Sequence, residues 1–214
     1  MRIRPRRTAQ AGGITFLATT LLMTIGPGPV AAQSEVKSDP SGLQLGVHLN
    51  ASAVKYEGED FSVDEVEKGG GLGFTLGYGF NRTVSLFANF DGATLNAGDE
   101  RDEFILGHGD LGLRLAFGRE DRAAMMYLVG AVTGRMERYD VGGEDVDVYG
   151  PGLTGGVGFF WFLSPTVAID LGLLGTWGEY TTVSSGGESV DLDPTVEALS
   201  SRIDIGLTWV PGGG

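Results

Sequence analysis

Residues 69–80 read Gly-Gly-Gly-Leu-Gly-Phe-Thr-Leu-Gly-Tyr-Gly-Phe, and this stretch decides the fold. From Leu72 to Phe80 every even-numbered residue is large and apolar, whereas the odd-numbered residues between them are glycine or threonine. Because successive side chains of a β-strand point to opposite faces, a period of two residues predicts a strand. One face of this strand is strongly apolar and the other is almost bare.

The same alternation predicts further strands near 42–52, 84–96, 104–117, 153–162, 167–173 and 202–209. The segment near 124–136 is apolar on both faces, so the pattern leaves its facing undecided. Pro151 has no backbone N–H to donate, and we therefore expect regular pairing of the sixth strand to begin after it. The faces opposite the apolar ones carry eight ionisable residues: His48, Asp91, His108, Asp110, Arg114, Asp170, Arg202 and Asp204.

Seven connections join these eight predicted strands, and long acidic connections alternate with short ones. The long connections cover 55–68, 97–103, 138–147 and 184–197, and the short ones cover 81–83, 118–122 and 163–165. Outer-membrane barrels have this asymmetry, with short periplasmic turns and longer extracellular loops. The acidic residues of the four long connections are, in order, Glu57, Glu59, Asp60, Asp64, Glu65 and Glu67; Asp99, Glu100, Asp102 and Glu103; Glu144, Asp145 and Asp147; and Glu188, Asp191 and Asp193.

We expect the apolar faces to point outward into lipid and the small and polar faces to fill the interior, which is the reverse of a soluble barrel. Backbone groups in a bilayer must pair internally, which only helices and closed barrels achieve, and the sequence has no apolar run of about twenty residues for a helix. Aromatic residues near the predicted strand ends indicate an interfacial girdle. They are Tyr78, Phe80, Phe117, Tyr127, Phe159, Trp161 and Trp209.

The first 32 residues have the pattern of a secretory signal peptide. Four arginines between Arg2 and Arg7 precede an apolar run over 14–25, which is too short to cross about 30 Å of hydrocarbon. Small residues precede the expected cleavage point between Ala32 and Gln33. We therefore predict a cleaved signal peptide over 1–32, a short leader over 33–41 and one barrel domain over 42–211. The predicted fold is an all-β, eight-stranded, antiparallel up-and-down transmembrane β-barrel.

Composition excludes several classes of protein. The chain has no cysteine, so it carries neither a disulfide nor a lipid-attachment site. Residues 1–32 contain four arginines and no acidic residue, and removing them changes the formal net charge from −13 to −17. So acidic a chain is not expected to bind nucleic acid.

The chain resembles the small eight-stranded outer-membrane β-barrels, the family that includes the transmembrane domain of OmpA and OmpX-like proteins. The resemblance covers about residues 42–211 and rests on residues 69–80 and on Asp204-Ile205-Gly206-Leu207-Thr208-Trp209. The second motif resembles the family's C-terminal assembly signal, with Asp204, Gly206 and Trp209 in the expected places. The resemblance implies the outer membrane of a Gram-negative-type bacterium as the location, insertion by the outer-membrane assembly machinery, and contact with outer-membrane lipids and lipopolysaccharide.

Eight strands enclose an interior that side chains just fill, so we expect the eight ionisable residues to form a salt-bridge network in the lumen. We predict no enzyme and no catalytic, cofactor or metal site, and a structural or surface-interaction role through acidic extracellular loops. A narrow ion-conducting pore, a secreted lipocalin-like carrier of a small molecule and a lipid-modifying barrel enzyme stay open as alternatives. Binding of Ca²⁺ or Mg²⁺ by the acidic loops stays open too.

Overall fold

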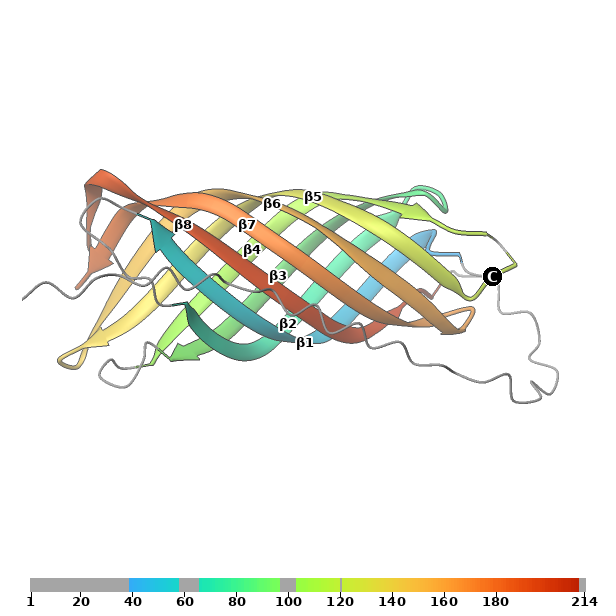
Figure 1. The fold of residues 1–214 in the computed structure, drawn as a ribbon, viewed down its shortest axis with the longest axis horizontal. Helices are drawn as coiled ribbons and strands as arrows, with labels where there is room; N and C mark the ends of the chain where they lie inside the picture. The colour runs from blue at the N-terminus through green and yellow to red at the C-terminus, as the bar shows by residue number, and fades with distance from the viewer. Residues whose placement is uncertain (1–38, 58–65, 97–102, 120, 212–214) are drawn as a thin grey trace, which may run out of the picture. The chain divides into compact units, whose positions relative to one another are not determined.

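A computed structural model describes residues 39–57, 66–96, 103–119 and 121–211 (Figure 1). The predicted signal peptide, its cleavage point at Ala32 and Gln33, and the acidic residues at 58–65 and 97–102 lie outside this range. No helix among the described residues is long and apolar enough to span a membrane. The strands are β1 (Gly42–Glu57), β2 (Glu67–Gly79), β3 (Val84–Asn96), β4 (Phe104–Phe117), β5 (Ala124–Val141), β6 (Glu144–Ser164), β7 (Val167–Ser185) and β8 (Glu188–Trp209).

The eight strands form a closed antiparallel barrel in which each strand pairs with its neighbours in sequence. The ring closes between β1 and β8, whose register runs from Leu45 opposite Trp209 to Glu57 opposite Glu197. The predicted eight-stranded up-and-down barrel is therefore confirmed. This register also places the start of β1 and the end of β8 at the same end of the barrel as the short turns.

The two faces of each strand point as the alternation predicts. On β2 Leu72 and Tyr78 are 68% and 54% exposed, whereas Thr75 on the opposite face is 7% exposed. Apolar side chains also lie outside on β1, β4, β7 and β8, and polar side chains lie inside. This facing is the opposite of the one that a lipocalin-like carrier requires.

The structure settles the facing of β5. Met126, Leu128 and Val132 lie on the outside, and Tyr127 and Thr133 lie on the inside. The expectation that Tyr127 belongs to the interfacial girdle is therefore wrong: it is 4% exposed and points into the lumen. Among the other predicted girdle residues, Tyr78, Phe80, Phe117, Trp161 and Trp209 lie outside near the short turns and are each at least half exposed, whereas Phe159 is half-buried.

Two of the predicted long connections are extended hairpins instead. Pairing of β5 with β6 continues to Val141 opposite Glu144, so the predicted connection at 138–147 shrinks to the turn Gly142–Gly143. Pairing of β7 with β8 likewise continues to Ser185 opposite Glu188, and only Gly186–Gly187 lie between them. All four glycines have positive φ, which suits a two-residue hairpin turn, so the chain reverses here without a loop.

These two hairpins make β5 to β8 longer than a bilayer requires. A tilted transmembrane strand needs about 9–11 residues, and these four strands have 18, 21, 19 and 22 residues, compared with 13 to 16 in β1 to β4. Figure 1 shows both hairpins projecting at the same end of the barrel. We call them the β5–β6 hairpin (residues 138–149) and the β7–β8 hairpin (residues 179–197).

Pro151 does not delay the pairing of β6, contrary to expectation. It lies opposite Gly134 in the β5–β6 ladder, which continues without interruption to Glu144. On the other side, the register with β7 shifts between Tyr149 and Gly152, so Pro151 lies at an irregularity. A bulge of this kind accommodates a residue that cannot donate to the ladder.

Candidate functional site

The lumen of the barrel contains polar side chains between two apolar clusters. One cluster, near the hairpin end, includes Leu95, Phe104 and Leu106, all 1% exposed or less. The other, near the short turns, includes Met125, Phe160 and Phe162, which are similarly buried. Apolar side chains therefore lie at both ends of the lumen, and most of the polar groups between them are buried.

Arg202 on β8 is the central cation of this polar layer. Its guanidinium donates to Asp91 on β3 through Nη1 and to Asp110 on β4 through Nη2, the second contact at 2.7 Å. All three side chains are 2% exposed or less. Buried charges of this kind persist only when they are paired and hydrogen-bonded, and Arg202 thereby ties three strands together across the lumen.

Neutral polar side chains complete the hydrogen bonds of both carboxylates. Asp91 accepts from Asn89 and, at 3.4 Å, from Asn50. Asp110 accepts from Thr133 at 2.7 Å and from Thr154 at 3.3 Å. These contacts join β1, β3, β4, β5 and β6 into one network.

A second charged group lies toward the short turns. The Arg114 guanidinium lies 3.7 Å from Asp170 and is surrounded by three aromatic rings, at 5.4 Å from the centroid of Phe87, 4.5 Å from that of Tyr127 and 4.9 Å from that of Phe160. Tyr127 donates its hydroxyl proton to Asp170 at 2.6 Å. The rings supply cation–π attraction, so this cage holds a cation in a largely apolar layer.

Sequence reasoning missed a third group, at the hairpin end of the lumen. Glu137 accepts hydrogen bonds from three tyrosine hydroxyls, those of Tyr56, Tyr139 and Tyr180. Arg135, 2% exposed, donates to the carbonyl of Ala198 at 2.7 Å, and its guanidinium lies 4.7 Å from the Tyr180 ring centroid. The alternation continuing from Thr133 through Arg135 to Glu137 could have revealed this group, but we expected the strand to end near residue 136.

The structure places all eight ionisable residues singled out from the sequence in the lumen, but they do not form one network. His48, Asp91, Asp110 and Arg202 are linked directly. Arg114 and Asp170 belong to the aromatic cage. His108 contacts neither group by a hydrogen bond and instead pairs with Ser200, at 2.9 Å. Asp204 lies next to His48, as described below.

The His108–Ser200 pair combines a base with a hydroxyl, but its setting does not favour nucleophilic catalysis. An activated nucleophile needs a base that a third group orients and a site that substrate can reach. His108 is 5% exposed and Ser200 1% exposed, and no carboxylate of the described residues hydrogen-bonds to His108. The pair therefore acts as a polar contact between β4 and β8.

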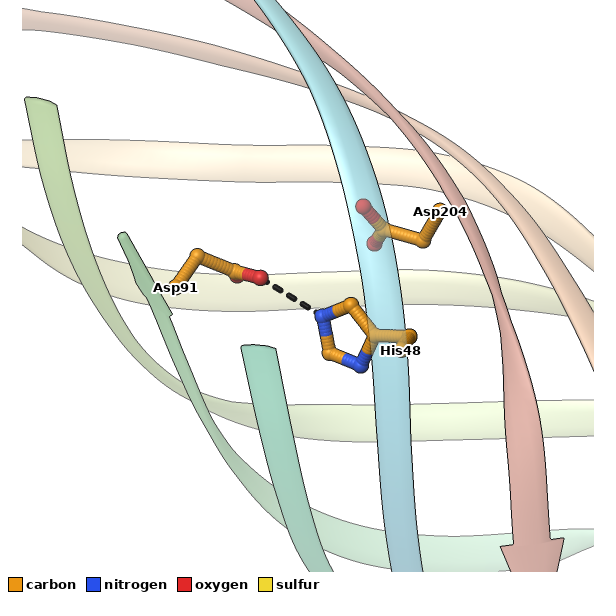
Figure 2. Close-up of side chains that lie close together, drawn as sticks. All are labelled: His48, Asp91 and Asp204. Carbon is orange, nitrogen blue, oxygen red and sulfur yellow. Dashed lines mark hydrogen bonds and ion pairs between the residues drawn. The ribbon is translucent and has the colours of Figure 1, made fainter. Parts of the chain in front are cut away.

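The remaining cluster consists of His48 on β1, Asp91 on β3 and Asp204 on β8. Figure 2 shows the His48 ring nitrogen bonded to Asp91, with the carboxylate of Asp204 beside the ring. The Nε2 to Oδ1 distance from His48 to Asp91 is 2.6 Å. One ligand atom from each of the three residues lies within 4.8 Å of the others, which is close enough for all three to reach one metal ion.

The fold is similar to that of solved outer-membrane proteins. Neisserial surface protein A matches with a TM-score of 0.62 and 15% identity, over 79% of this chain and 97% of that one. The outer-membrane protein OprG from Pseudomonas aeruginosa matches with a TM-score of 0.51 and 15% identity, over 79% of this chain and 95% of that one. No family model and no curated protein matches the sequence. The chain therefore has the fold of the small eight-stranded outer-membrane barrels.

Proposed function

We propose that this protein is an integral barrel of a Gram-negative-type outer membrane whose two acidic hairpins bind a cationic partner outside the cell. The fold and the apolar exterior support the membrane location, because large exposed side chains such as Leu72, Leu111 and Ile205 encircle a polar lumen. Outer-membrane lipids and lipopolysaccharide then surround the barrel. Asp204, Gly206 and Trp209 would serve as the assembly signal read by the insertion machinery.

The observation that carries the proposed binding role is the charge of the two hairpins. Arg138 is the single basic residue in residues 138–149 and 179–197, and it is paired with Asp147 at 2.6 Å. A surface with one sign of charge attracts partners of the opposite sign and speeds their encounter. The acidic residues that lie exposed on the hairpins are Asp140, Glu144, Asp145, Glu188, Asp191, Asp193 and Glu197.

The rigidity of the hairpins also supports a binding role. The β5–β6 ladder is continuous to its tip, and the β7–β8 ladder resumes after a register shift and is paired from Thr182 opposite Asp191 to its tip, so most of the acidic side chains project from paired strands. The Arg138 guanidinium donates two hydrogen bonds to the Asp147 carboxylate, and these hold the pKa of Asp147 below its usual range. A preformed surface loses less conformational entropy when it binds a partner.

A lumen that conducts ions is less well supported than a lumen that is blocked by side chains. Arg202 joins carboxylates from two strands across the lumen, and apolar clusters lie on both sides of it. An ion would have to displace both kinds of contact to pass. We therefore expect no single-channel conductance from the protein in planar bilayers, and steady conductance that changes in Arg114→Ala or Arg202→Ala would favour the pore.

Binding of a basic peptide such as oligolysine to the protein in detergent tests the proposed role. We expect binding that weakens with added salt and that weakens further when Asp140, Glu144 and Asp145 become Asn, Gln and Asn. A matched control replaces Asp121, an exposed acidic residue in the turn between β4 and β5, with Asn. Equal binding by the hairpin variant and the native protein would contradict the proposed role, while leaving the membrane barrel untouched.

A further inference from the structure

We propose that His48, Asp91 and Asp204 form a buried site for one divalent transition-metal ion inside the lumen. The proposal concerns the interior and is independent of the role of the hairpins. One imidazole nitrogen and two carboxylate oxygens are a donor set that suits Zn²⁺ or Mn²⁺, whereas Ca²⁺ and Mg²⁺ prefer oxygen ligands alone. The three ligand atoms lie within 4.8 Å of one another, so small side-chain rotations would close them around an ion.

The balance of charge in this layer calls for a further cation. Arg202 pairs with both Asp91 and Asp110, and Arg114 is next to Asp170, so two guanidinium groups face four carboxylates and none of the described residues' guanidinium groups pairs with Asp204. The Oδ1 atom of Asp204 is shut off from solvent and accepts no hydrogen bond. A buried carboxylate oxygen without a partner is costly. A metal ion at this point would supply both the missing charge and the missing contact.

The backbone around the cluster leaves room for the ligands to converge. A Cβ at Gly73 would lie 2.0 Å from Nε2 of His48 and 2.2 Å from Oδ1 of Asp91, so any side chain at this position would occupy the place where the two ligand atoms meet. Gly206 also packs closely against this part of β1, because a Cβ there would lie 2.3 Å from the carbonyl oxygen of Val47 and 2.5 Å from the Cβ of His48. The missing side chains of these two glycines therefore shape the space for His48 and Asp91.

A small cavity adjoins the cluster on the side of His48 and Asp204. Its volume is about 30 Å³, and Thr75, Asn89 and Thr208 supply polar groups to its wall. This space is large enough to hold a water molecule. A metal ion held by the three side chains could therefore complete its coordination with a water in the cavity.

The groups around the ligands are already fixed. Asp91 accepts hydrogen bonds from Asn50 and Asn89 and forms an ion pair with Arg202. These three contacts hold its carboxylate in place. Such outer contacts orient ligands and are part of a metal site. Since Nε2 of His48 is 2.6 Å from Asp91 Oδ1, an ion held between these two atoms must displace the hydrogen bond that joins them.

Titration with Zn²⁺ tests the site. The whole protein, folded in detergent and stripped of metal with a chelator, is titrated with zinc chloride in a calorimeter, and Co²⁺ absorption gives a second readout of the ligand set. We expect one equivalent of Zn²⁺ to bind, with affinity lowered at least about tenfold in Asp204→Asn and in His48→Gln. His108→Gln removes a buried histidine outside the cluster and should leave the affinity unchanged.

A further variant distinguishes Zn²⁺ binding at the surface from Zn²⁺ binding in the lumen. Replacing Glu144 and Asp145 with Gln and Asn removes exposed carboxylates from a hairpin tip and should not alter the single equivalent. Each variant is first checked for a heat-dependent gel shift, so that misfolded protein is set aside, and Asp204→Asn keeps the size of the side chain. Failure of the folded native protein to bind Zn²⁺, or equal affinity in both cluster variants and the native protein, would overturn the proposal.

Discussion

The lumen holds acidic and basic groups in contact, whereas the hairpins hold acidic groups almost alone. Inside, Arg202 lies between Asp91 and Asp110, with all three side chains 2% exposed or less. On the hairpins, Asp140, Glu144 and Asp145 face solvent. Water can solvate the hairpin charges, whereas a buried charge in the lumen needs a protein partner or a bound ion. Charge in the lumen therefore contributes to stability, and charge on the hairpins remains available for binding.

Arg202→Ala should give the largest loss of stability, because it leaves two buried carboxylates without a cation. We expect the free energy of unfolding to fall by about 3–5 kcal/mol, measured by urea unfolding of the folded protein in detergent. Arg119→Ala is the matched control, since Arg119 forms an ion pair with Asp121 while 76% exposed. Equal stability of the Arg202 variant and the native protein would contradict a structural role for lumen charge.

Gly73→Val should give the next largest loss in the free energy of unfolding. The added side chain would occupy the space between His48 and Asp91, and overpacking of this kind costs about 1–3 kcal/mol. Gly130→Val, on the outer face of β5, is the control, because a Cβ there would meet nothing within 4 Å. Urea unfolding should separate the two variants, and similar curves would show that the close packing around His48 does not matter.

Tyr180→Phe should lower the free energy of unfolding by a comparable amount, about 1.5–3 kcal/mol, because it removes one of three hydroxyl donors to the Glu137 carboxylate. The change leaves the ring, and hence the contact with Arg135, in place. Tyr149→Phe serves as the comparison, since its hydroxyl bonds to Asp147 on the exposed hairpin. A larger loss in the Tyr149 variant, measured by urea unfolding, would reverse the contrast between lumen and hairpins.

Gly143→Ala should have the smallest effect and should act on the hairpin alone. Its φ of +90° strains any residue with a Cβ, by about 1–2 kcal/mol. We expect faster amide hydrogen exchange near the tip of the β5–β6 hairpin and an unchanged midpoint for unfolding of the barrel. A lowered midpoint would mean that the hairpin and the barrel unfold together.

Strand alternation was sufficient to predict the barrel and the direction of most side chains. A period of two residues assigns each side chain to a face, and β2 and β8 follow it closely. It could not settle β5, because small or apolar residues such as Val129 and Val132 occupy both faces. The undecided facing of β5 also explains why Tyr127 is wrongly predicted to lie in the girdle, since its hydroxyl donates to Asp170 inside the lumen.

The lengths of β5 to β8 were harder to predict. Acidic residues and paired glycines at 138–147 and 184–197 usually mark loops, yet Gly142–Gly143 and Gly186–Gly187 form tight turns that let the strands continue. Which charged residues contact one another in the lumen could not be predicted from the sequence either. Contacts such as that from Arg202 to Asp110 depend on the positions of strands far apart in sequence.

The outward apolar surface is the central claim, and gel mobility of the membrane fraction tests it most directly. Closed membrane barrels resist unfolding by SDS until they are heated. The protein should therefore migrate differently in an SDS gel when the outer-membrane fraction has been boiled and when it has not. The account predicts that the protein is found in that fraction and shifts on boiling. A soluble periplasmic protein with the same mobility in both samples would contradict it.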